Sequence, residues 1–115
     1  MTTRQMAEQI SQGALDSVLT RLYGEKDLSM QKNRYCKTID EFEKRFGANR
    51  EIALFSAPGR TEICGNHTDH QRGHVLAAAV AEDCVAVASP RADEQAVLLS
   101  AGYALVRLPL GRLEP

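Results

Sequence analysis

The sequence of 115 residues has no tryptophan, and aromatic residues make up only 5% of it. With so few rings, a surface that stacks nucleic-acid bases is not expected. An excess of either charge is also missing, because 14 lysines and arginines oppose 15 acidic residues, for a formal net charge of −1. We therefore expect neither nucleic acid nor a membrane surface as a partner.

Long apolar runs are absent as well. No segment approaches the ~20 consecutive apolar residues that a membrane span needs. The N-terminus, Met1 to Glu8, is polar and lacks the apolar core of a signal peptide. These features predict a cytoplasmic protein. The length allows one small domain or part of a larger one.

Cysteine is scarce and widely spaced, with Cys36, Cys64 and Cys84 and no Cys-x-x-Cys pair. This excludes a zinc knuckle and a disulfide framework, and it predicts reduced thiols that are mostly packed in the fold. The sequence also lacks a Gly-x-x-x-x-Gly-Lys-Ser/Thr loop and a Gly-x-Gly-x-x-Gly fingerprint. A nucleotide site is therefore not encoded in these residues.

Two helices are predicted in the first half of the chain. An apolar stripe at every fourth position predicts a helix over residues 3–23, with a capping box between Thr2 and Gln5 and an end at Gly24. A second helix is expected over residues 29–46, ended by Gly47. Residues 1–48 are thus predicted to be a helical lead-in.

Short strand-like segments follow after Arg50. The predicted strands are residues 52–57, closed by Pro58-Gly59, and then 75–80, 84–89, 96–100 and 104–110, with a turn at Gly102. The fold class predicted is α+β, with a helical pair followed by an antiparallel or mixed sheet. Such a sheet would be bare on one face, so we expect residues 49–115 to be the first part of a larger domain.

The segment from Pro58 to Leu76 carries the functional signal. It holds three glycines, three histidines, two arginines and an aspartate between apolar segments, which is typical of a loop that meets a ligand. Arg60 follows the Pro-Gly break, and its guanidinium suits phosphate or carboxylate oxygens. The alternative for Arg60 is a surface salt bridge.

The side chains of Asn66, His67 and Asp69 combine hydrogen-bond donors and acceptors within four residues, as a polyhydroxylated ligand requires. The alternative is an Asx-type turn in which Asn66 and Asp69 bond their own backbone. A metal site made by Asp69 with His67, His70 and His74 is disfavoured, because flanking glycines indicate a loop rather than one helix face. We predict no metal ligands here.

These residues resemble the signature of the galactokinase branch of the GHMP small-molecule kinases, which reads approximately Gly-Arg-x-Asn-Leu-Ile-Gly-Glu-His-Thr-Asp-Tyr-Asn-x-Gly-x-Val-Leu-Pro. The gapless match runs from Gly59 to Ala77, about 20 residues. The resemblance implies the N-terminal domain of a GHMP-type kinase, with a ribosomal protein S5 domain 2-like fold. It implies transfer of the ATP γ-phosphoryl group to the anomeric hydroxyl of galactose.

By position, the resemblance implies that Arg60 stabilises the transition state. It implies that Asn66, His67, Thr68 and Asp69 form the sugar-binding segment. ATP and Mg²⁺ would be the cofactors, with their ligands and the catalytic aspartate outside this sequence. The isolated chain is therefore expected to be inactive.

The main departure from the signature is Asn66, which replaces the usual sugar-binding glutamate. One strong charge-assisted acceptor is lost, worth on the order of 1.5–3 kcal/mol. In addition, His70 replaces the usual tyrosine, and Cys64 occupies a position that is normally small or aliphatic. The sugar is therefore expected to be galactose or a close derivative. A non-catalytic, galactokinase-like sugar sensor and an inactive structural fragment remain as alternatives.

Overall fold

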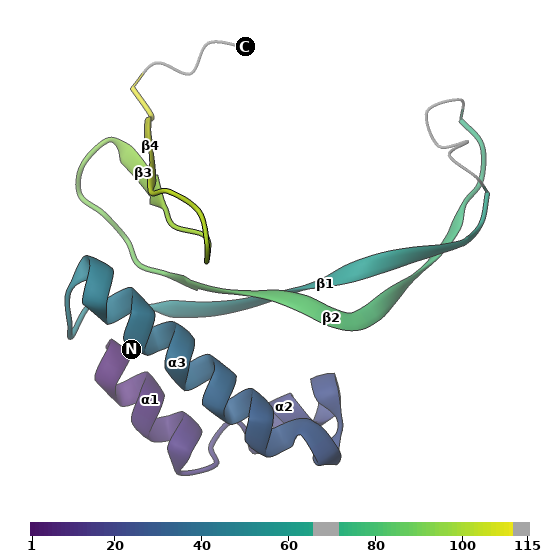
Figure 1. Cartoon of the computed structure of the whole chain (residues 1–115), viewed down its shortest axis with the longest axis horizontal. Helices are drawn as coiled ribbons and strands as arrows, with labels where there is room; N and C mark the ends of the chain where they lie inside the picture. The colour runs from purple at the N-terminus through teal and green to yellow at the C-terminus, as the bar shows by residue number, and fades with distance from the viewer. Residues whose placement is uncertain (66–71, 112–115) are drawn as a thin grey trace.

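The computed structural model describes residues 1–65 and 72–111. Within them, helices come first and strands follow (Figure 1): α1 Thr3–Ser11, α2 Asp16–Tyr23, the 3₁₀ helix η1 Glu25–Asp27, α3 Leu28–Phe46, β1 Ala53–Cys64, β2 Leu76–Ala88, β3 Gln95–Leu98 and β4 Val106–Pro109. In this part of the chain β1 pairs antiparallel with β2, and β3 with β4, as two separate sheets. The α+β class with antiparallel pairing is confirmed, although the strands do not form one sheet.

The helix predicted over residues 3–23 is two helices, so the predicted helical pair is wrong. The capping box between Thr2 and Gln5 starts α1 as predicted. Gly13 then adopts a φ of +87°, and its N–H donates to the carbonyl of Ile10 while the N–H of Ala14 donates to Gln9. This is a Schellman C-terminus, which ends α1 although the apolar stripe continues through it.

The other helix ends agree with the sequence. Gly24 follows α2 with a φ of +84°, and Gly47 follows α3 with a φ of +94°, values that favour glycine. α3 begins at Leu28, one residue before the prediction, and ends at Phe46 as predicted. No helix within the described residues is both long and apolar enough to cross a membrane.

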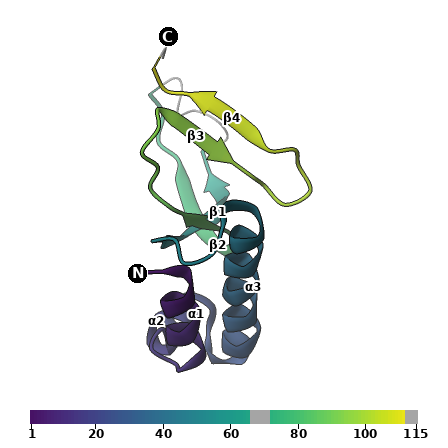
Figure 2. The same cartoon turned by 90° about the vertical axis from the view of Figure 1, so that its left-hand side faces the viewer.

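The core lies between the helices and the nearer half of the β1–β2 hairpin. Its buried apolar side chains are Ile10, Leu19, Tyr35, Ile39, Phe42 and Ile52. Leu54 of β1 and Val85 and Val87 of β2 pack against this cluster. In Figures 1 and 2 the helices lie together on one side of the hairpin, next to the end where β1 begins and β2 finishes.

The N-terminus is joined to the segment that leads into β1. The N–H of Thr3 donates to the carbonyl of Arg50, and the N–H of Ile52 donates to that of Met1. The Thr3 side chain, which is fully buried, accepts from the N–H of Asn49 at 3.0 Å and donates to Glu43. The helices and the start of the hairpin are therefore held by both packing and hydrogen bonds.

β1 is longer than predicted because it continues through Pro58-Gly59 to Cys64. Proline is tolerated in a two-stranded sheet, where each strand has one edge without partners. The register between the strands shifts between Pro58 and Arg60 and again between Glu62 and Cys64. The two apolar runs predicted at residues 75–80 and 84–89 belong to one strand, β2.

The strands project away from the helical core. The Cα radius of gyration is 17.6 Å, against about 13 Å for a compact domain of this length. Most side chains of β1, β2, β3 and β4 are exposed, and Figure 1 shows the far half of β1–β2 extending past the helices. The prediction that apolar strand surface is left uncovered agrees with this shape.

Candidate functional site

Arg60 lies in β1, opposite Ala79 of β2 and directly after the first register shift. The predicted irregularity at Pro58-Gly59 is therefore present, although it bends a strand instead of ending it. Arg60 is exposed, and its side chain forms no salt bridge or hydrogen bond with the described residues. The alternative of a surface salt bridge has no support in this part of the chain.

The other predicted site residues, Asn66, His67, Thr68 and Asp69, lie outside the described residues, as does His70. Their roles therefore stay predictions. Among the described residues, no group of three His, Cys, Asp or Glu side chains could hold a metal ion. The four-residue metal set that includes His74 is not tested, because its other members lie in the undescribed segment.

Gly65 anchors the start of that segment. Its φ is +120°, and a Cβ at this position would lie 2.7 Å from the Cα and from a methyl carbon of Val75. The segments before and after residues 66–71 thus approach each other at Gly65 and Val75, at a point where only glycine fits. Gly65 brings the end of β1 next to the residue that precedes β2.

Substituting Gly65 with alanine should disturb the outer half of the hairpin. A strained backbone costs about 1–3 kcal/mol, and contact with the Val75 backbone adds to this cost. We expect amide hydrogen exchange near Cys64 and Leu76 to be at least about tenfold faster, since 1.4 kcal/mol corresponds to one decade. Gly24→Ala is the control: Gly24 also has a positive φ, but a methyl group added there would meet no other atom within 4 Å. Unchanged exchange in Gly65→Ala would contradict the prediction.

A polar cluster joins the helices to the hairpin close to Arg60. The carboxylate of Asp83, only 3% exposed, accepts from Arg34 at 2.5 Å and from the hydroxyls of Tyr23 and Ser56 at 2.5 Å each. A second Arg34 nitrogen donates to the Asp83 carbonyl at 2.8 Å. The hydroxyls of Tyr23 and Tyr35 are also bonded, at 2.9 Å. We call Asp83, Arg34, Tyr23 and Ser56 the Asp83 cluster.

The Asp83 cluster was missed by the sequence analysis. Its only signal was a pair of adjacent carboxylates, Glu82 and Asp83, inside an otherwise apolar segment between residues 80 and 88. A charge in such a position must find partners when it is buried. The partners come from α2, α3 and β1, and their spacing along the chain gives no hint of the contact.

The cluster alters the acidity of two of its members. Desolvation opposes the charge on Asp83, but hydrogen bonds from Ser56, Tyr23 and Arg34 outweigh it and lower the pKa of this carboxyl. Burial, together with the hydrogen bond to Asp83, raises the pKa of the Tyr23 hydroxyl well above its usual value. Asp83 is thus held as a carboxylate and Tyr23 as a neutral phenol.

The stability of the protein should therefore depend on Asp83 at acid pH. A carboxyl whose pKa is lowered by folding contributes its full stabilisation above about pH 4, the unfolded value, and loses it as pH falls toward the folded value. In urea titrations from pH 7 to pH 2, the wild type should lose more stability than Asp83→Asn. Asp40→Asn, which removes an exposed carboxyl from α3, should follow the wild-type curve. Parallel curves for wild type and Asp83→Asn would contradict this.

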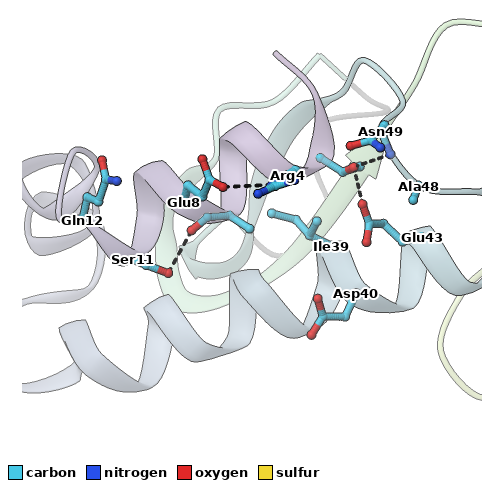
Figure 3. A pocket seen from close by; sticks show the side chains of 11 residues that line it. Arg4, Glu8, Ser11, Gln12, Ile39, Asp40, Glu43, Ala48 and Asn49 are labelled. Atoms are coloured by element: carbon cyan, nitrogen blue, oxygen red, sulfur yellow. Dashed lines mark hydrogen bonds and ion pairs between the residues drawn. The ribbon is translucent and has the colours of Figure 1, made fainter.

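A groove of about 510 Å³ lies between α1 and α3 (Figure 3). Its walls include Arg4 and Glu8, which form an ion pair at 3.0 Å, and Asp40 and Glu43 of α3. None of its lining residues comes from β1 or β2. The groove therefore does not include Arg60, the predicted site residue that the structure describes.

The cysteines differ from the prediction of packed thiols. All three are free, but Cys64 and Cys84 are exposed and only Cys36 is partly buried. The reason is that both exposed cysteines lie on the hairpin, where the helices cover little of the strand surface. The prediction of reduced thiols agrees with the structure, whereas the prediction of packing is wrong for these two.

Comparison with known proteins finds similarity to one family over the end of α3 and the β1–β2 hairpin. Residues 40–90 match the galactokinase galactose-binding signature, a span from the second half of α3 through β1 and β2. The chain is 48% identical to the galactokinase of Canis lupus familiaris over 59 residues, which are 51% of this chain and 15% of that protein. It is 46% identical to human galactokinase over 59 residues, with the same shares.

A more distant relative matches a segment of similar length. The galactokinase of Lactococcus lactis is 31% identical over 64 residues, which are 56% of this chain and 16% of that protein. The matches thus span only 15% or 16% of the length of these relatives. No solved structure matches the chain.

Proposed function

We propose that this chain forms the galactose-binding part of an ATP-dependent sugar kinase of the galactokinase family. The observation that supports this most strongly is the signature match over residues 40–90. That span includes the hairpin on which Arg60 is exposed. The reaction proposed for the whole enzyme is transfer of a phosphoryl group to the anomeric hydroxyl of galactose.

Within this proposal each site residue has a role that follows from its chemistry. The guanidinium of Arg60 neutralises charge on the phosphoryl group during transfer, since such reactions depend mainly on positioning and electrostatics. His67 and Asp69 hydrogen-bond sugar hydroxyls. Asn66 and Thr68 complete the sugar-binding segment, with Asn66 as a neutral substitute for a carboxylate.

The described residues offer no group that fits ATP or Mg²⁺. The sequence has no phosphate-binding loop, and the described residues contain no group of acidic or imidazole side chains suited to a metal ion. We place the ligands of both cofactors in other parts of the kinase, so this chain alone should not catalyse transfer. We also propose a cytoplasmic location and a ribosomal protein S5 domain 2-like fold for the complete sugar-binding domain.

A non-catalytic sugar sensor is the second candidate, and Asn66 favours it. The substitution removes one charge-assisted acceptor from the sugar-binding segment, so the segment departs from the signature at a position that the family uses to hold the sugar. The same substitution is compatible with a kinase for an amino or acidic galactose derivative. The sequence of a longer protein that contains this chain would separate the sensor from the kinase. A Ser/Gly-rich loop that enters a helix, followed by an aspartate, would support the kinase.

Calorimetric titration of the 115-residue chain with D-galactose tests the proposal. We expect binding of galactose that is stronger than binding of its 4-epimer, D-glucose. Asp69→Asn should weaken binding by one to two decades, the equivalent of about 1.5–3 kcal/mol for a charge-assisted hydrogen bond. Asp40→Asn, on α3, should bind as the wild type does. Failure of the wild-type chain to bind any of these sugars would contradict the proposal.

A further inference from the structure

The hairpin that carries Arg60 has two halves with different surroundings. In the near half, Leu54, Val85 and Val87 pack on the helical core. In the far half, Ile63 is 61% exposed and Leu76 is 55% exposed. The helices therefore support the near half. The direction of the far half depends on the strand geometry at the junction between the two halves, at Pro58 to Arg60.

The junction is an irregularity in strand pairing. Pro58 pairs with Asp83, and the next pair along is Arg60 with Ala79, so residues 80–82 of β2 lie opposite Gly59 alone. Extra residues in one strand of a pair bend the ribbon and increase its twist. Gly59 is close-packed here, because a Cβ on it would lie 3.0 Å from a Val80 methyl carbon.

The Asp83 cluster sits at this junction. Asp83 is the regularly paired β2 residue next to the irregularity on the side of the helices. Ser56, two residues before Pro58, donates to the same oxygen of the Asp83 carboxylate as Tyr23 does. Arg34 holds both the carboxylate and the backbone carbonyl of Asp83, so it fixes the strand as well as the side chain. A buried carboxylate with this many directed donors has little freedom to reorient.

We propose that Asp83, Arg34 and Tyr23 are positioning residues that set the direction in which the far half of the hairpin, with Arg60, leaves the helices. Tyr23 and Arg34 belong to α2 and α3 and lie outside residues 40–90, the span of the galactose-binding signature. The lead-in helices thereby contribute to the position of the strand segment that carries Arg60. The consequence for sugar affinity rests on the proposed function, whereas the positioning itself does not.

The positioning is tested by measuring the angle of the hairpin directly. Nitroxide labels are placed on exposed Cys64, at the end of β1, and on Met30→Cys in α3, with Cys36 and Cys84 changed to serine. Double electron–electron resonance should give one narrow distance distribution in the reference protein. Asp83→Asn should shift the mean or broaden the distribution, and Tyr23→Phe, which keeps the ring, should do so to a smaller extent.

Asp40→Asn serves as the matched control, because it neutralises an exposed aspartate of α3 and should leave the distances unchanged. Circular dichroism shows which variants are folded. If Asp83→Asn is unfolded, Tyr23→Phe provides the test. Folded Asp83→Asn or Tyr23→Phe variants with the reference distance distribution would overturn the proposal. A change only in thermal stability would likewise assign the cluster a purely structural role.

Galactose titrations of the same proteins separate this proposal from the proposed function. Asp83→Asn is expected to bind galactose about tenfold more weakly than wild type. If the wild type binds and the variant binds equally well, the link from the Asp83 cluster to sugar affinity is wrong while the proposed function stands. If the wild type does not bind, the proposed function fails, and the distance measurements still decide the positioning.

Discussion

Replacing Arg60 with alanine should lower kcat by about 10³-fold or more in a kinase that contains this chain. This magnitude is taken from other phosphoryl-transfer enzymes, in which an arginine that neutralises charge in the transition state raises kcat by about 10³–10⁵-fold. Arg60 is suited to this role because it is exposed and makes no ion pair within the described residues. The measurement is a coupled assay on a polypeptide that joins this chain to the ATP-binding part of a galactokinase.

The expected loss is mainly in kcat, because Arg60 is proposed to act on the transferred phosphoryl group and less on the bound sugar. Arg21→Ala provides the control, since Arg21 is exposed on α2 and has no proposed role. Full turnover by the Arg60 variant would remove the arginine from the mechanism. A rise in KM with unchanged kcat would assign it to ground-state binding only.

Replacing Ile39 with alanine should lower the free energy of unfolding of the helical core by about 2–5 kcal/mol. Ile39 is 1% exposed and lies in a core that holds six buried apolar side chains among the described residues. Truncation of a buried isoleucine costs about 2–5 kcal/mol, and the total stability of a domain is about 5–15 kcal/mol. The loss is therefore a large share of the total stability, and the melting temperature should fall clearly. Thermal unfolding followed by circular dichroism measures the effect.

Met30→Ala is the matched control, because Met30 lies on the same helix but is 60% exposed. It should change the melting temperature little. Because Leu54, Val85 and Val87 pack on the same core, Ile39→Ala should also release the near half of the hairpin. A cooperative transition in Ile39→Ala at the wild-type temperature would contradict this view of the core.

Local signals in the sequence predicted most of the secondary structure. The ends at Gly24 and Gly47 and the capping box of Thr2 with Gln5 depend on neighbouring residues alone, and all three are confirmed. The break at Gly13 was missed because the apolar stripe has the same period on both sides of it. The continuation of β1 through Pro58 was missed because the tolerance for proline depends on the partner strand.

The polar contacts of the fold could not be predicted from the sequence. Asp83 and its partners Tyr23 and Arg34 are separated by 60 and 49 positions, so their contact depends on how the hairpin packs on the helices. Arg60 was identified because the Pro-Gly step and the family signature lie beside it. The roles of Asn66, His67, Thr68 and Asp69, and the division of the chain at residue 48, stay predictions.

The central claim is that Arg60 and Asp69 face the same small sugar, with Arg60 toward the anomeric position. It is tested most directly by measuring the affinity of wild type, Arg60→Ala and Asp69→Ala for galactose and for galactose 1-phosphate. Asp69→Ala should weaken binding of both ligands, whereas Arg60→Ala should weaken binding of the phosphorylated sugar by at least about tenfold and leave galactose binding nearly unchanged. Equal affinities of Arg60→Ala and wild type for galactose 1-phosphate would contradict the account.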